Sequence, residues 1–172
     1  MSTPEPGALQ LGSTGLRWLW LSALTILLDQ ATKLGIVARL TVHESVTVSD
    51  FFSIVHWHNT GAAFSFLASQ PGWQRPLFTV FALVASAIIL RLLWSTSGRI
   101  WFCAALALIL GGALGNLIDR FAYGYVIDFL LFHWNDWIFP AFNVADSAIS
   151  VGAAILILDS MRKPHMPIGN KA

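Results

Sequence analysis

The chain has 172 residues, of which 56% are hydrophobic and only 11% are charged, and its mean hydropathy is +0.66. This composition lies outside the range of ordinary soluble domains and indicates an integral membrane protein. The net charge of +1 gives no sign of a nucleic-acid partner. The single cysteine, Cys103, excludes an intramolecular disulfide and, within an apolar run, is expected to be a small buried hydrophobe.

Four apolar runs predict four membrane-spanning helices in a single domain. A hydrocarbon core about 30 Å thick requires roughly 20 helical residues per span. The polar residues 1–15, which contain Pro and Gly, are expected to be a flexible tail. The first run lacks a basic n-region and a cleavage signature, so we interpret it as a retained span and not a signal peptide. The predicted spans are residues 18–38, 76–94, 100–118 and 140–158, the last opening at Pro140.

Two segments between the spans are predicted to lie outside the membrane. Residues 41–73 alternate and are rich in Val, Thr, Phe and Ile, which is typical of short strands. Residues 121–139 form the second segment. The distribution of Lys and Arg predicts cytoplasmic termini and outward-facing larger loops. One side would hold Arg17, Arg91, Arg99, Arg162, Lys163 and Lys171, and the other Arg39, Arg75 and Arg120.

Five aspartates lie in or beside apolar sequence: Asp29, Asp119, Asp128, Asp146 and Asp159. Asp159 is next to Arg162 and Lys163 and is expected to be a solvated interfacial charge. The other four fall in the outward-facing half of the predicted bundle. Asp146 follows Pro140 by six residues, which places it ~9 Å below the expected helix start. A carboxylate at that depth costs roughly 2.5–3.5 kcal/mol and needs a partner inside the bundle.

The pattern Asn-x-x-Asp occurs twice, in "GNLID" (Asn116 and Asp119) and in "FNVAD" (Asn143 and Asp146). Residues three apart share a helical face, so we expect each asparagine to lie beside its own aspartate, and the Asn143 amide to donate to Asp146. An alternative for Asp119 is an ion pair with Arg120 that anchors the helix end.

Asp128, in the apolar stretch "YVIDFLL", is hard to explain as a solvated loop charge. Two carboxylates in one site cannot both ionise cheaply, which leaves one general acid and one general base around a water, as in aspartic proteolysis. The spacing leaves open whether Asp119 or Asp128 pairs with Asp146.

Three smaller patterns have competing interpretations. In "NTGAAFSF", which begins at Asn59, Gly61 allows either a tight turn or the close approach of an extended substrate. His56 and His58 would share one strand face, but a metal site is disfavoured because no Cys or carboxylate cluster accompanies them. Small residues four apart (Ala107, Gly111 and Gly115) predict close helix packing, within the bundle in preference to a dimer.

Five motifs in order resemble those of lipoprotein signal peptidase (signal peptidase II), a family of bacterial intramembrane aspartic proteases. The resemblance covers residues 18–162, almost the whole chain. The motifs are "DQATK" at 29–33, "NTGAAFS" at 59–65, "GGALGNLIDR" at 111–120, "VIDF" at 126–129 and "FNVADSAI" at 142–149.

The resemblance implies an enzyme that removes the signal peptide of a prolipoprotein just before a cysteine carrying diacylglycerol. It implies that Asp128 and Asp146 are catalytic. Asn59, Gly112, Asn116, Arg120 and Asn143 would line the substrate or inhibitor site, with Asp29 and Asp119 in support. It also implies four transmembrane helices, a small extracytoplasmic sheet cradle and a short helical flap that suits residues 41–73. The resemblance further implies that the protein lies in the bacterial inner membrane and acts as a monomer. Its expected partners are lipidated prolipoproteins and membrane lipid. It is expected to be inhibited by globomycin and to need no metal or organic cofactor.

Two other functions compete with proteolysis. Intramembrane carboxylates also mark proton relays, so a proton- or ion-coupled transporter is the main alternative. Four spans without a visible inverted repeat argue against it. A structural membrane subunit is the second alternative, but it would not need Asn and Asp clustered at one depth.

Overall fold

The computed structural model describes residues 14–61 and 74–161. Most of the tail expected over residues 1–15, and residues 62–73 of the segment expected to form a flap, lie outside these ranges. The described elements, in chain order, are η2 (Gly15–Trp18), α1 (Leu19–Val37), β1 (Ser45–Ser49), β2 (Phe52–Asn59), α2 (Gln74–Ser95), α3 (Ile100–Ala122), β3 (Val126–Trp134), β4 (Trp137–Ile138) and α4 (Val144–Met161).

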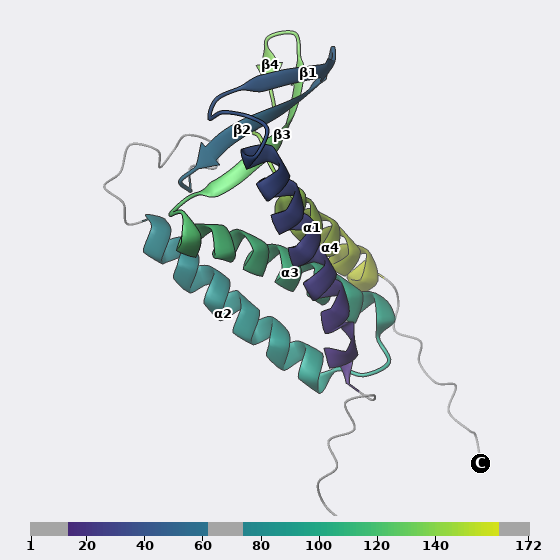
Figure 1. Cartoon of the computed structure of the whole chain (residues 1–172). Coiled ribbons are helices and arrows are strands. Elements are labelled where there is room, and N and C mark those ends of the chain that lie inside the picture. The colour runs from purple at the N-terminus through teal and green to yellow at the C-terminus, as the bar shows by residue number, and fades with distance from the viewer. Residues whose placement is uncertain (1–13, 62–73, 162–172) are drawn as a thin grey trace, which may run out of the picture.

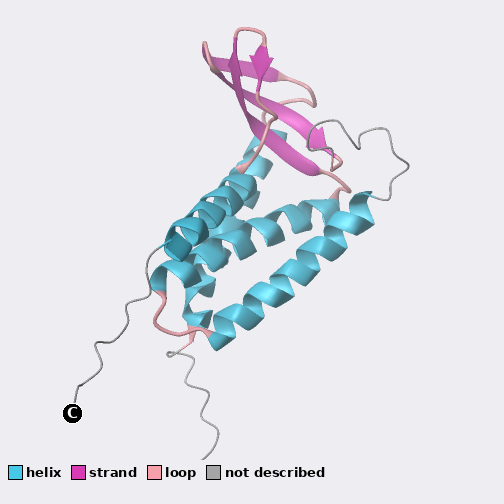
Figure 2. Cartoon of the chain, turned by 180° about the vertical axis from the view of Figure 1, so that it is seen from behind, coloured by secondary structure: helices cyan, strands magenta, loops and turns pink. Residues whose placement is uncertain are grey.

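The four helices form a bundle, and the sheet stands at one end of it (Figure 1). α3 is the central helix and contacts α1, α2 and α4. α1 begins, and α4 ends, at the end of the bundle away from the sheet (Figure 1). The loop between α2 and α3 lies at that same far end (Figure 2). The segment between α1 and α2 carries β1 and β2, and the segment between α3 and α4 carries β3 and β4. Both segments therefore lie at the end of the bundle where the sheet stands.

Within the described ranges, three helices are long and apolar enough to cross a membrane: Pro76–Ser95, Ile100–Ala122 and Val144–Met161. These match the second, third and fourth predicted spans, apart from their exact ends. α1 coincides with the first predicted span but is interrupted by polar residues. Four of its polar side chains form one buried stripe (Ser22, Thr25, Asp29 and Lys33), whereas its leucines at 24, 27, 28 and 34 are exposed. This arrangement reverses that of a soluble helix and is typical of a helix that faces lipid.

The fourth helix begins at Val144, and the prediction that it begins at Pro140 is wrong. The backbone of Phe142 pairs with β3, where the N–H groups of Phe129 and Leu130 both donate to its carbonyl oxygen at 3.0 and 2.9 Å. The residues before Asn143 thus extend the sheet and cannot join the helix. Asp146 consequently lies in the first turn of α4 and not ~9 Å below its start.

The sheet is antiparallel, in the order β1-β2-β3-β4. The strands expected within residues 41–73 are confirmed by β1 and β2. β3 comes from the second segment, residues 121–139, for which no strand was predicted. Its register pairs Trp57 with Asp128 and Asn59 with Val126, after an irregularity between Ile54 and Trp57. Residues opposite one another share a face of the sheet, so this register places Asn59 close to Asp128.

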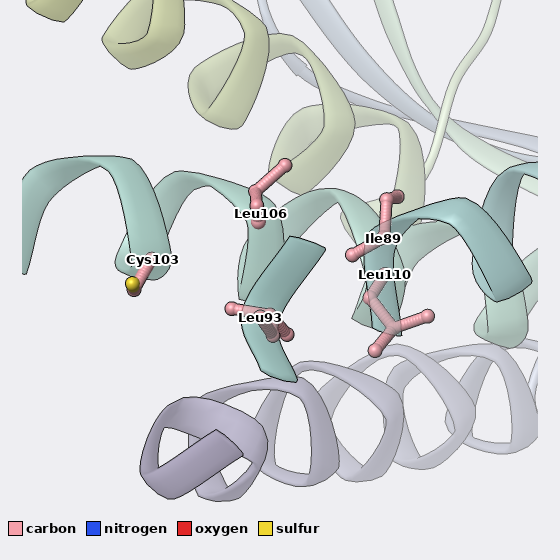
Figure 3. Close-up of a cluster of buried hydrophobic side chains, with 5 residues drawn as sticks. All are labelled: Ile89, Leu93, Cys103, Leu106 and Leu110. Atoms are coloured by element: carbon pink, nitrogen blue, oxygen red, sulfur yellow. The ribbon is translucent and has the colours of Figure 1, made fainter. Parts of the chain in front are cut away.

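An apolar cluster packs α2 against α3 at the far end of the bundle from the sheet. It consists of Ile89 and Leu93 from α2 and Cys103, Leu106 and Leu110 from α3 (Figure 3). Cys103 is 2% exposed, which confirms the prediction of a small buried hydrophobe.

Glycines of α3 bring its backbone against α1 and α4. A Cβ atom added at Gly111 would lie 2.9 Å from the carbonyl oxygen of Ser22, and one at Gly112 would lie 2.3 Å from that of Ala145. Backbone atoms cannot move aside as a flexible side chain can. The small residues therefore serve packing within the bundle, as predicted, and they fix where the start of α4 lies.

Gly112→Ala is expected to destabilise the fold because the new methyl group overlaps the Ala145 carbonyl. Overpacking of this kind costs about 1–3 kcal/mol. The matched control is Gly35→Ala in α1, where the nearest atom is the terminal nitrogen of the Arg39 side chain at 3.2 Å. Thermal unfolding in one detergent should give a clearly lower Tm for Gly112→Ala and an unchanged or higher Tm for Gly35→Ala. Equal melting temperatures for the two variants would contradict this packing account.

Candidate active site

Asp128 is a buried carboxylate in β3, one of the two inner strands of the sheet, with an exposure of 3%. It accepts a hydrogen bond at each oxygen. The Asn59 Nδ2 donates to Oδ2 at 2.9 Å and the Asn143 Nδ2 donates to Oδ1 at 2.8 Å. Asn59 is itself held by the turn that follows β2, because its Oδ1 accepts from the N–H of Gly61 at 2.9 Å. Gly61 has φ +112°, a conformation that favours glycine and that agrees with a bend of the chain at this point.

Asp146 lies in the first turn of α4, where Asn143 is the residue that caps the helix. The backbone N–H of Asp146 donates to the Asn143 Oδ1 at 2.9 Å, which is the usual capping contact three residues into a helix. The Asp146 side chain accepts from the Asn116 Nδ2 at 2.7 Å. Asp146 is therefore held both by its own helix and by α3.

The two asparagines exchange the partners that their spacing suggests. The Asn143 amide donates to Asp128 and not to Asp146, because capping turns its oxygen toward the N–H of Asp146. The Asn116 amide donates to Asp146 and not to Asp119. Asn143 also donates to the Asn116 Oδ1 at 3.2 Å. Asp128 and Asp146 are thus linked through two side-chain amides, which favours Asp128 as the aspartate that lies with Asp146.

Asp119 belongs to a separate buried ion network. Its partner is Lys33, whose Nζ lies 2.8 Å from the Asp119 Oδ2 and 2.8 Å from the Asp29 Oδ2. Among the described residues no ion pair joins Asp119 to Arg120, so that alternative is wrong; the Arg120 Nη1 donates to the backbone oxygen of Asn116 at 3.2 Å. A buried ammonium between two buried carboxylates is a stronger electrostatic partner than an interfacial guanidinium.

The same network holds the elements that carry Asp128 and Asp146. The Asp119 Oδ2 accepts from the N–H of Ile127, directly before Asp128, at 3.1 Å. The Asp29 Oδ1 accepts from the N–H of Ala145, directly before Asp146, at 2.9 Å. Each supporting carboxylate therefore fixes the backbone next to one of the two site carboxylates.

The other predicted residues are placed as follows. Gly112 lies in the contact between α3 and α4. His56 and His58 do share a strand face, with their Nε2 atoms 3.2 Å apart. Within residues 14–61 and 74–161, no group of three His, Cys, Asp or Glu side chains is placed to hold a metal ion. Asp159 pairs with Arg99, while Arg162 and Lys163 lie outside the described residues.

Two residues of the buried network, Lys33 and Gln30, were not among the predicted site residues. Gln30 donates to the Asp119 Oδ1 at 2.9 Å. The available signal was the spacing of Asp29 and Lys33, which are four residues apart inside an apolar run. Opposite charges at that spacing lie on one helical face and neutralise one another, so the pair was detectable as a buried unit.

The pKa of Asp128 is raised to about 7, first because burial disfavours its charged form and second because of the negative charge of Asp146. The hydrogen bonds from Asn59 and Asn143 and the charge of Lys33 act in the opposite direction. Near neutral pH the pair can accordingly hold one proton between two carboxyl groups. Such a pair can supply a base and an acid to the same reaction.

Comparison with known proteins places the chain in a family. The family model described as signal peptidase (SPase) II matches residues 21–162. A lipoprotein signal peptidase from Janthinobacterium sp. (strain Marseille) is 52% identical over 151 residues, covering 88% of this chain and 92% of the relative. One from Tolumonas auensis is 50% identical over 160 residues, covering 90% and 96%.

A solved structure agrees in fold. A bacterial membrane enzyme determined by the in meso method at 1.9 Å resolution superimposes with a TM-score of 0.75 at 26% identity, covering 86% of this chain and 94% of the other. Together with the three apolar helices, these matches identify a membrane-embedded peptidase: the chain belongs to the signal peptidase II family.

Proposed function

We propose that this chain removes the signal peptide from diacylglyceryl-modified prolipoproteins, cutting just before the lipidated cysteine, and that Asp128 and Asp146 activate the hydrolytic water. The observation that carries the proposal is the pair of carboxylates bridged by Asn116 and Asn143, in a chain of the signal peptidase II family. Its relatives bear the name lipoprotein signal peptidase. The proton-coupled transporter is not favoured by this family assignment.

In the proposed reaction Asp146 is the base and Asp128 the acid. Asp146 lies at the N-terminus of an 18-residue helix, where the helix dipole stabilises an anion. It takes a proton from water as the water oxygen bonds to the scissile carbonyl carbon, and Asp128 gives its proton to the carbonyl oxygen. The tetrahedral diol then returns a proton to Asp128 as the C–N bond breaks, and the leaving nitrogen takes the proton from Asp146.

We also propose that all four helices span the bacterial inner membrane, with both termini cytoplasmic and the sheet on the outer side. α1 qualifies because its charged residues are buried and paired while its outward face is apolar. The site then lies near the outer interface, where water is within reach and a substrate's acyl chains can enter from the lipid. The enzyme is proposed to act as a monomer without a metal or organic cofactor.

Asp128→Asn and Asp146→Asn should each reduce cleavage to the background rate, because each removes one half of the acid–base pair. Asp119→Asn should leave measurable cleavage if the protein folds, since Asp119 acts on the backbone of Ile127 and not on the reacting atoms. Asp136→Asn, in the exposed turn between β3 and β4, is the matched control for loss of a carboxylate. The measurement is cleavage of a purified lipidated prolipoprotein, and wild-type rates in either of the first two variants would refute the pairing.

The pH profile should show a decline in kcat/KM as pH rises through about 7, because Asp128 then loses the proton that it donates. In Asp146→Asn the pKa of Asp128 should fall, since the neighbouring charge is removed, yet stay above that of an ordinary aspartate because burial remains. Carbon NMR of labelled aspartate carboxyl groups can follow this in the inactive variant. An unchanged pKa would show that the two carboxylates do not interact.

The proposed orientation can be tested by labelling single cysteines in a Cys103→Ala background. Asp136→Cys lies in the exposed turn of the sheet and Ser97→Cys in the exposed loop between α2 and α3. A membrane-impermeant maleimide added to spheroplasts should label the first, and the second only after the membrane is opened. The reverse order of labelling would invert the proposed topology.

A further inference from the structure

Lys33 is buried in the bundle and all three of its N–H donors are used. Its exposure is 1%, and its Nζ contacts the Asp29 and Asp119 carboxylates at 2.8 Å each and the Asn116 Oδ1 at 2.9 Å. Two of these contacts neutralise charge. The third reaches the amide that donates to Asp146, and neutralisation does not account for it.

Two donors set which way the Asn116 amide faces: the Lys33 ammonium, at 2.9 Å from its Oδ1, and the Asn143 Nδ2, at the longer distance of 3.2 Å. A lysine ammonium can only donate, so the Asn116 oxygen must point toward Lys33 and its nitrogen must point away. The nitrogen then donates to the Asp146 Oδ1 at 2.7 Å. With the amide reversed, its oxygen would face the carboxylate and its NH₂ group the ammonium, and both contacts would be repulsive.

We propose that Lys33 is a positioning residue of the peptidase site: it fixes the orientation of Asn116, and through Asn116 it holds Asp146 in place as the carboxylate that activates water. This inference rests on the proposed function. The Lys33 side chain is 2% exposed and extends from α1 toward α3. Its ammonium contacts Asn116 and the two supporting carboxylates, Asp29 and Asp119, and does not contact Asp128 or Asp146. It should therefore affect the rate of the chemical step and not substrate binding.

Charged residues from four elements surround Lys33 and Asn116. Asp29 lies on α1, Asp119 and Arg120 on α3, Asp128 on β3 and Asp146 on α4. Lys33→Met removes a positive charge and leaves Asp29 and Asp119 both unpaired, which can prevent folding. The combined variant Asp29→Asn/Lys33→Met removes one charge of each sign, so the net charge of the network is the same as in the wild type. The amide introduced at position 29 keeps an oxygen that can accept from the N–H of Ala145.

The experiment compares Asp29→Asn/Lys33→Met with Asp29→Asn, and Lys33→Met with the wild type, on the same lipidated prolipoprotein in detergent. In each pair, loss of Lys33 should lower kcat roughly tenfold or more while KM stays within about twofold. It should also move the alkaline limb of the pH profile upward, because the charge of Lys33 lowers the pKa of Asp128. Arg39→Met, an exposed basic residue just after the same helix, should leave both constants unchanged.

Three results would contradict the role proposed for Lys33. If Asp29→Asn/Lys33→Met cleaves as fast as Asp29→Asn, Lys33 only neutralises its neighbours. If KM rises while kcat is kept, it acts on binding, and if the charge-balanced variant does not fold, as judged by thermal unfolding, its role is structural. A wild-type protein that does not cleave the substrate would contradict the proposed function, whereas cleavage without the Lys33 effect contradicts this inference alone.

Discussion

The ion pairs that the buried Lys33 ammonium forms with Asp29 and Asp119 are the interaction on which the rest of the site depends. Three acceptors surround the ammonium, two of them carboxylates with no exposure to solvent. Leaving one such charge unpaired inside a low-dielectric bundle costs several kcal/mol, so Lys33, Asp29 and Asp119 must come together for α1 to pack. The carboxylates also accept the backbone N–H groups of Ile127 and Ala145.

Positioning of Asp128 and Asp146 follows from that arrangement. One comes from a strand and the other from a helix, and they meet because Asn143 ends the sheet pairing and begins α4. The same asparagine caps the helix and donates to Asp128. A single side chain thereby couples the geometry of a helix end to that of β3. The close contact at Gly112 keeps α4 near α3, so that Asn116 reaches Asp146.

Buried polar side chains and exposed leucines lie on opposite faces of α1. On α1, Ser22, Thr25, Asp29 and Lys33 face the protein, and the leucines at 24, 27, 28 and 34 face outward. Polar groups are inside because lipid offers them no hydrogen bonds, and apolar groups are outside because lipid does not penalise them. A peptidase with this arrangement can keep charged chemistry in the bundle while its surface stays in contact with hydrocarbon. The sheet stands at one end of the helices, and its strand β3 carries one of the two carboxylates.

Hydropathy, alternation and five motifs are properties of local sequence, and they were enough to predict the membrane class, four helices, strands within residues 41–73 and the family to which the chain belongs. The sequence did not determine β3, whose apolar run resembles a buried strand and a helix equally well. It also misplaced the start of α4, assigned the Asn143 amide donor to Asp146 where it donates to Asp128, and offered Arg120 as a partner for Asp119. Three contacts in the folded protein account for these differences: capping orients the Asn143 amide, a long-range strand pairing delays the start of α4, and Lys33 from α1 forms an ion pair with Asp119. The strand pairing and the Lys33 ion pair join residues that are far apart in the chain. The capping contact depends on where the strand pairing lets α4 begin. Local sequence spacing therefore does not predict any of the three.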